Sequence, residues 1–208
     1  MAGCGRTDTG VHASVYYAHF DTGKVGLERD GDFLFRINGK LPHDIVIHEF
    51  LQVTPDAHSR FHATSRTYEY HIMRKKDVFQ GDYAHYIYGE MDTVAMQRGA
   101  EILREYTDFT SFSKVDTDAK TNDCRIDEAR WEITDNKMDF KITADRFLRN
   151  MVRAIVGTLL DVGFNRISLD EFRQIIESRN RSNAGTSAPA KGLFLTDVQY
   201  PPEIFLPA

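Results

Sequence analysis

Two segments of alternating apolar and polar residues, joined by only three residues, constrain the fold most strongly. EARWEIT (128–134) and MDFKITA (138–144) both have the period of two that is typical of a strand with one buried face. A parallel pair of strands needs a long crossover, whereas the connection Asp135-Asn136-Lys137 suits a hairpin. These residues therefore predict two neighbouring antiparallel strands.

The rest of the chain adds strands and helices without a repeated strand–helix–strand order. We expect strands at 13–20, 44–53, 64–74 and 192–200, and helices at 32–42, 92–106, 146–163 and 168–179. The last helix begins with a capping box, Ser168 and Glu171. This order predicts an α+β fold with a mainly antiparallel sheet. The segment near 77–92 is the expected boundary between an N-terminal lobe, 1–85, and a C-terminal lobe, 86–208.

Composition places the chain among globular proteins, because 41% of its residues are hydrophobic and 27% are charged. A net charge of −5 does not by itself indicate a nucleic-acid-binding protein. Two segments, 59–76 and 141–153, nevertheless have a clear excess of Lys and Arg. Such runs are often solvated faces, but if both lined one cleft, this acidic protein could bind a polyanion there.

The cysteines and the apolar runs indicate the cellular compartment of such a chain. Cys4 and Cys124 form no motif, which predicts a reduced, cytoplasmic protein. Residues 1–13 are rich in glycine and polar, unlike a signal peptide, and no apolar run has the length of a membrane span. His58 and His62 have the spacing of a helical metal-ligand pair, but their segment leads into a strand, so we expect ordinary polar histidines.

GCGRTDTGVHA (3–13) is the strongest candidate for chemistry, because it presents one carboxylate, Asp8, on a glycine-rich loop. A single ionised carboxylate can act as a nucleophile, and a neighbouring arginine stabilises its charge. Arg153 follows Arg149 by one turn of a largely apolar predicted helix, so it requires an ion-pair partner. Asp8 is the first candidate for that partner, and Asp145 or a surface carboxylate is the alternative.

The tripeptide Asp8-Thr9-Gly10 also allows a second hypothesis, a dimeric aspartic protease. In those enzymes two such aspartates share a proton. This chain has no second copy of the tripeptide, and Arg6 beside the pair would oppose the shared proton. The sequence therefore disfavours a protease.

Several segments together resemble one known family. GCGRTDTGVHA closely resembles the signature of the TruA-type tRNA pseudouridine synthases, with Thr9 where the family usually has alanine. Further segments resemble that family in the same order along the whole chain: INGKLPHDI (37–45), SRFHATSRTYEYHI (59–72), FLRNMVRAIVG (147–157) and APAKGLFLTDVQY (188–200).

The resemblance implies a fold and an activity. The fold would be the α+β pseudouridine-synthase fold, two lobes joined by a mainly antiparallel sheet with flanking helices and a central basic cleft. The enzyme would convert uridine to pseudouridine at positions 38–40 in the anticodon stem-loop of tRNA. It would need no metal or cofactor, and it would act as a homodimer with tRNA bridging the subunits.

The resemblance also implies roles for individual residues. Asp8 would be the catalytic aspartate, Arg153 its ion-pair partner, and Tyr68 the tyrosine that packs against the uracil ring. Arg6 would help to displace the target nucleotide from the stem. The other expected substrate-binding residues are Arg60 and Arg66 near phosphates, Arg149, and Leu193 and Leu195, which would line the base pocket or simply belong to the strand core.

One difference from the family concerns the start of the chain. The family normally has a further segment before the aspartate loop, with a strand, a Gly-Trp-Gln loop and a helix. We therefore expect this chain to lack part of the N-terminal lobe and of the RNA-binding surface. A catalytically impaired tRNA-binding fragment is the resulting alternative function.

Overall fold

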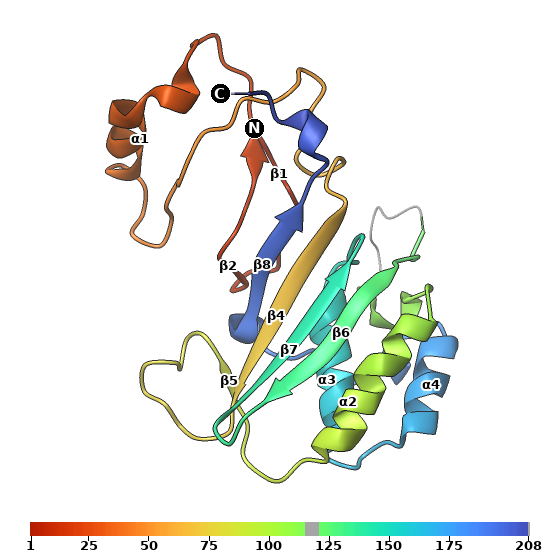
Figure 1. The fold of residues 1–208 in the computed structure, drawn as a ribbon. Coiled ribbons are helices and arrows are strands. Elements are labelled where there is room, and N and C mark those ends of the chain that lie inside the picture. Colours follow the sequence, from red (N-terminus) through yellow and green to blue (C-terminus); the bar gives the residue numbers. More distant parts are fainter. Residues whose placement is uncertain (115–120, 208) are drawn as a thin grey trace.

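The computed structural model describes residues 1–114 and 121–207 (Figure 1). Its strands are β1 (Ala2–Gly3), β2 (His12–Ala13), β3 (Ala18–His19), β4 (Ser65–Met73), β5 (His85–Tyr86), β6 (Ile126–Ile133), β7 (Lys137–Ala144) and β8 (Leu193–Gln199). Its α-helices are α1 (Gly31–Asn38), α2 (Thr93–Ile102), α3 (Met151–Gly163) and α4 (Leu169–Glu177). Short 3-10 turns lie at Leu27–Arg29, Leu103–Glu105, Thr110–Phe112, Arg181–Asn183, Ala190–Gly192 and Pro202–Ile204.

The central sheet has the order β2-β8-β4-β7-β6, with β5 paired to β4. The three long pairings, β4 with β7, β4 with β8 and β6 with β7, are antiparallel, and the two-residue strands β2 and β5 pair in parallel. The predicted hairpin at 128–144 is therefore confirmed as β6 and β7, and so is the mainly antiparallel sheet. Because β4 has a long partner on each side, its side chains are held on a fixed surface.

One face of this sheet forms the core together with the helices. Along β4 and β7, alternate residues such as Tyr70, Ile72, Phe140 and Ile142 are fully buried. Helices α2 and α3 cover this face and α4 packs against both of them (Figure 1); α3 is the most apolar of the three, with most of its residues buried. This arrangement confirms the α+β class predicted from the order of the elements.

Helix ends follow ordinary capping chemistry. Asp30 and Asp92 begin α1 and α2 by accepting from the backbone N–H of the residue three positions later, and Ser168 begins α4 with the predicted capping box. Predicted helix 146–163 is shorter than expected, because Asn150 has a φ of 65° and α3 begins only at Met151.

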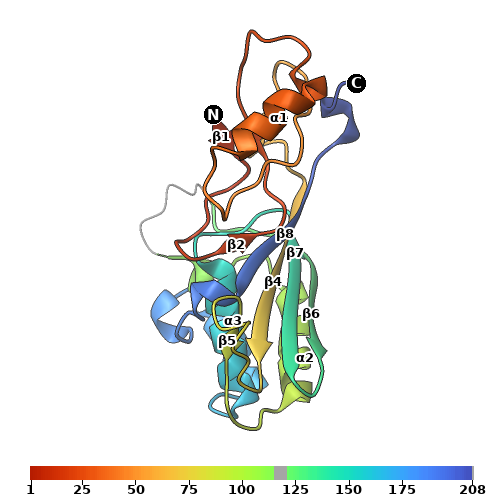
Figure 2. The same cartoon turned by 90° about the vertical axis from the view of Figure 1, so that its left-hand side faces the viewer.

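The N-terminal and C-terminal segments meet at one end of the molecule, beside α1 (Figure 2). The backbone N–H of Leu206 donates to Gln52 O at 2.9 Å, and Val53 forms an isolated bridge with Phe205. This end is only lightly packed, since α1 buries none of its residues completely.

Two predicted strands were wrong. Residues 13–20 form only β2 and β3, because the intervening backbone changes partner: Ser14 N donates to Leu195 O of β8 at 3.0 Å, whereas Tyr17 O accepts from Cys4 N at 2.8 Å. Residues 44–53 are irregular, and Ile47 is held by the side chain of Asn38 rather than by a neighbouring strand. Alternation predicts a strand only where a partner strand is available.

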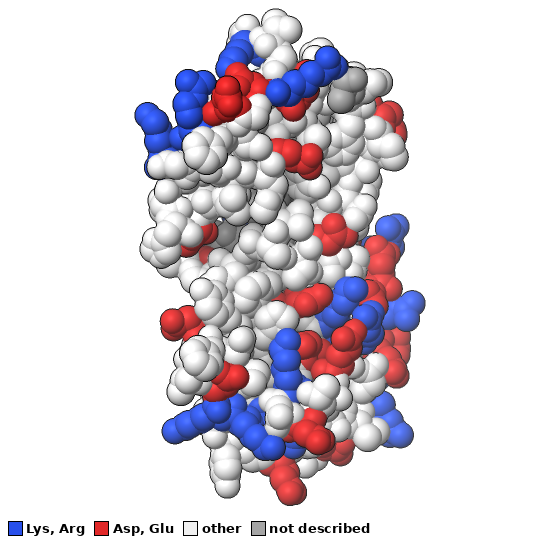
Figure 3. Space-filling model, turned by 60° about the vertical axis from the view of Figure 1, so that its left-hand side comes forward, with Lys and Arg blue, Asp and Glu red and all other residues white. Residues whose placement is uncertain are grey.

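Charge is distributed unevenly over the surface. On the face shown in Figure 3, charged side chains gather near the upper and lower ends, with a broad and mostly uncharged band between them. The net charge of −5 therefore does not describe any local surface. Within the described residues, no helix is both long and apolar enough to cross a bilayer.

Candidate active site

Asp8 lies on the loop between β1 and β2, in a tight turn. The backbone N–H of Val11 donates to Asp8 O at 3.1 Å, and Gly10 has a φ of 84°. Glycine suits that position because a side chain would be strained in the left-handed region. Parallel pairing of β2 with β8 ties the end of this loop to the central sheet. The loop is short and anchored on the side that follows the carboxylate.

The predicted ion pair between Asp8 and Arg153 is present. Arg153 Nη1 donates to Asp8 Oδ2 at 2.8 Å, and the two side chains are only 20% and 23% exposed respectively. Arg149 Nε lies 4.0 Å from the other carboxylate oxygen and is 58% exposed. The alternative partner, Asp145, instead accepts from the backbone N–H groups of Arg125 and Arg146. Arginine charge therefore faces both oxygens of Asp8.

A strap formed by residues 184–189 fixes the direction of Arg153. Arg153 Nε donates to Ala188 O at 2.7 Å, and Ala188 N donates to the backbone oxygen of Arg153 at 2.9 Å. Ser187 Oγ accepts from Asn150 at 2.6 Å and from Arg181 at 2.9 Å. The guanidinium is thus held on one side by the strap while its other side meets Asp8. The sequence does not indicate this role, because a backbone carbonyl is present in every residue.

We expect Gly157→Ala to destabilise the protein through this strap. A Cβ at Gly157 would lie 1.8 Å from Thr186 O, and that backbone atom cannot move as a flexible side chain does. Alanine in place of glycine normally stabilises a helix interior, but overpacking costs about 1–3 kcal/mol. We expect the overpacking cost to be larger than the gain in helix propensity at this position. Thermal unfolding followed by circular dichroism measures the effect. Gly23→Ala, where a Cβ meets no atom within 4 Å, is the control, and equal melting temperatures for the two variants would contradict this account.

Tyr68 lies on β4, with its ring 5.1 Å from that of Phe147 in an edge-to-face contact. It is buried and pairs in register with Leu195 on β8, next to a register shift at Thr67. Burial, with a smaller contribution from the nearby Cys4 thiol, raises the pKa of Tyr68 to about 12. The phenol therefore stays neutral at physiological pH, and the charge of Asp8 is close enough to contribute to the shift.

The other predicted site residues fall into two groups. Arg6, Arg60 and Arg149 are exposed, and the Arg60 guanidinium lies 5.7 Å from the centre of the Phe61 ring. Leu193 and Leu195 are buried on β8 and belong to the same core cluster as Tyr68. Their burial fits the strand-core interpretation, and a contact with a base stays a prediction.

Arg66 differs from the other arginines because its guanidinium points to the protein backbone. It donates to the carbonyls of Cys4, Arg60 and Asp145 at 3.0, 2.7 and 3.2 Å. This geometry does not support the expectation that Arg66 faces a phosphate.

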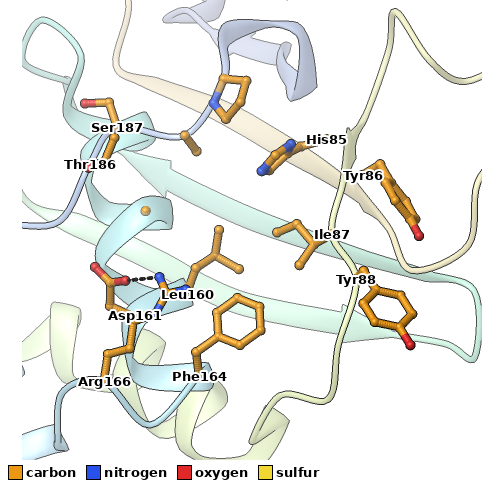
Figure 4. A pocket seen from close by; sticks show the side chains of 13 residues that line it. His85, Tyr86, Ile87, Tyr88, Leu160, Asp161, Phe164, Arg166, Thr186 and Ser187 are labelled. Carbon is orange, nitrogen blue, oxygen red and sulfur yellow. Dashed lines mark hydrogen bonds and ion pairs between the residues drawn. The ribbon is translucent and has the colours of Figure 1, made fainter.

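A pocket of about 420 Å³ lies beside the strap (Figure 4). Ile87, Leu160 and Phe164 contribute apolar side chains to it, and the ion pair between Asp161 and Arg166 lies at its edge. Thr186 to Pro189 also line it, but Asp8, Arg153 and Tyr68 do not. The three candidate catalytic side chains therefore lie outside this pocket, although Ala188 both lines it and accepts from Arg153.

The geometry argues against the alternative chemistries. An aspartic-protease pair needs two carboxylates that share a proton, whereas Asp8 is paired with a guanidinium. His58 and His62 hydrogen-bond to each other's segment, since His58 N donates to His62 Nδ1 at 3.1 Å. Among the described residues there is no group of three or more His, Cys, Asp or Glu arranged to bind a metal.

Comparison with known proteins identifies relatives that match almost the whole chain. A family model described as tRNA pseudouridine synthase matches residues 106–201. The chain is 50% identical over 208 residues to "tRNA pseudouridine synthase A" of Parabacteroides distasonis, an alignment that covers 99% of this chain and 81% of the relative. It is 52% identical over 206 residues to the protein of that name from Bacteroides fragilis, again with 99% and 81% coverage. Identity to the Bacillus subtilis protein of that name is 37% over 199 residues, with 94% and 79% coverage.

These similarities define the class of the protein, an isomerase that acts on uridine in tRNA. The chain belongs to the tRNA pseudouridine synthase family.

Proposed function

We propose that this chain isomerises uridine to pseudouridine at positions 38–40 in the anticodon stem-loop of tRNA, with Asp8 as the nucleophile. The observation that carries the proposal is the Asp8–Arg153 ion pair, 2.8 Å long, on a loop whose sequence matches the family signature. The names of the similar proteins support tRNA as the substrate.

The reaction moves the glycosidic bond of one nucleotide. The bond from N1 to C1′ breaks, the uracil turns, and C5 bonds to C1′; the hydrogen at C5 leaves as a proton and N1 gains a proton, so that the product is an isomer of uridine. Asp8 begins this sequence by attacking C1′, by attacking C6, or by removing the C2′ proton, and each route requires an ionised carboxylate. Arg153 supplies the matching positive charge in a fixed direction, because the strap holds its Nε.

The target base must first leave the helical stack, at a cost of a few kcal/mol. Tyr68 lies on a strand that is paired on both sides, and the charge of Asp8 contributes to the pKa shift of its phenol. We assign to its ring the role of holding the detached uracil by stacking. A neutral phenol suits this role because it adds no charge near the base.

The exposed arginines are the proposed contacts with the RNA backbone. Arg149 extends from the site toward solvent, Arg60 lies on the turn before β4, and Arg6 shares the loop of Asp8. We assign Arg6 to displacement of the target nucleotide, and Arg60 and Arg149 to phosphates. A cytoplasmic homodimer with tRNA bridging the subunits completes the proposal, each subunit having an N-terminal lobe, 1–85, and a C-terminal lobe, 86–208.

Mapping the modified positions tests the specificity directly. After incubation with unmodified tRNA, carbodiimide treatment and primer extension should stop at residues 38–40 and at no other uridine. Stops elsewhere in the tRNA would leave a pseudouridine synthase with a different target, and full-length extension would contradict the activity. A tRNA with cytidine at positions 38–40 is the control.

A further inference from the structure

Arg66 lies near the start of β4, where three segments of the chain meet. Its Nη2 donates to Arg60 O at 2.7 Å and to Cys4 O at 3.0 Å, and its Nη1 donates to Asp145 O at 3.2 Å. The three acceptors belong to the aspartate loop, to the turn before β4 and to the segment after β7. One side chain therefore joins three separate parts of the backbone.

Each of these segments carries a residue of the candidate site. Cys4 precedes Arg6 and Asp8 on their loop, and Asp145 precedes Arg149 in the segment that leads to α3. In the third segment, the turn before β4, the acceptor Arg60 is itself a residue of the candidate site. A shift of any acceptor relative to the other two would therefore move a charged group of the site.

The acceptors are themselves fixed points. Cys4 is fully buried, and its N–H donates to Tyr17 O at 2.8 Å. Asp145 Oδ1 accepts from Arg125 N and Arg146 N at 2.9 and 2.7 Å. Because Arg66 donates to the backbone of both Cys4 and Asp145, it holds the aspartate loop at a fixed position relative to the segment after β7.

Only an arginine can make this set of contacts. Three of its five N–H groups, which lie in one plane, reach the three carbonyls. A lysine has a single ammonium and cannot reproduce that fork. To bind a phosphate through the same groups, Arg66 would have to withdraw them from the carbonyls, which would leave those acceptors without these bonds.

We propose that Arg66 is a positioning residue that fixes the Asp8 loop relative to the segment bearing Arg149, and that it is not a phosphate contact. The inference rests on the proposed function of Asp8 only for its effect on turnover. Its structural part, the joining of the three segments, is measured without turnover.

Amide hydrogen exchange tests the structural part. Arg66→Gln and Arg66→Lys should both exchange faster than wild type in peptides covering 2–13 and 143–151, and should match wild type in β6 and α4. Lys75→Gln removes an exposed charge from the same basic run and should exchange as wild type does. Wild-type exchange of both peptides in both Arg66 variants would overturn the proposal.

The salt dependence of tRNA binding separates positioning from phosphate contact. The slope of log affinity against log salt should be unchanged in Arg66→Gln, whereas loss of a phosphate contact lowers it by about one. Turnover should fall about tenfold or more with little change in KM, because small displacements of reacting groups are costly. Arg66→Lys should not restore it. A reduced slope, or wild-type turnover in Arg66→Lys, would refute the positioning role, whereas an inactive wild type would refute only the proposed function.

Discussion

Asp8→Asn is expected to abolish pseudouridine formation while tRNA binding is retained. The substitution preserves the shape of the side chain but removes the charge that the proposed chemistry requires, so turnover should fall by about four orders of magnitude or more. The affinity for tRNA should stay equal or rise slightly, because the substitution removes a negative charge from a surface that faces a polyanion. Single-turnover assays and filter binding measure the two quantities.

Asp161→Asn is a closely matched control for this variant. Asp161 pairs with Arg166 at 2.9 Å, and its side chain is 23% exposed, as is that of Asp8. It differs in lying at the pocket of Figure 4 rather than at the aspartate loop. We expect wild-type turnover for Asp161→Asn. A similar loss in both variants would mean that general stability, and not the role of Asp8, explains the effect.

Arg153→Gln should produce the second largest loss. The substitution removes the positive charge that pairs with Asp8 and weakens the contact with Ala188 O, so turnover should fall about a hundredfold. Arg153→Lys keeps the charge but cannot donate in both directions at once, and we expect an intermediate value. Rapid-quench measurements of product formation at saturating tRNA give the rate.

Arg149→Gln serves as the comparison for Arg153. Arg149 Nε is 4.0 Å from Asp8, and its side chain is largely exposed, so its loss should weaken tRNA affinity more than it slows the chemical step. Equal effects of the Arg149 and Arg153 variants on the rate at saturating tRNA would contradict the distinct role given to Arg153. Melting temperatures of both variants show whether folding contributes.

Much of the fold could be predicted from the sequence because it depends on local patterns. The hairpin of β6 and β7, the central strand β4 and the capped helix α4 follow from alternation, turn length and capping residues. Residues 13–20 and 44–53 have the same alternation but no long partner strand among the described residues, and pairing depends on segments that are distant in sequence.

The candidate site, like the fold, was only partly predictable from the sequence. Pairing of Asp8 with Arg153 was predicted from the need of an arginine on an apolar helix for a partner, and it is confirmed. The expectation that Arg149 lies one turn before Arg153 on the same helix was wrong, since α3 begins only at Met151, but both arginines reach Asp8. Ala188 and the contacts of Arg66 act through backbone carbonyls, which every residue has, so no motif could have indicated them.

The most direct test of the central claim is tritium release from tRNA labelled at C5 of uridine. Forming the bond from C5 to C1′ must expel that hydrogen, so release reports the isomerisation itself. We expect release by this 208-residue chain, in proportion to the pseudouridine found in the product, and none by Asp8→Asn. Binding of the labelled tRNA by the chain without tritium release would contradict the account and would leave a tRNA-binding protein in place of an active synthase.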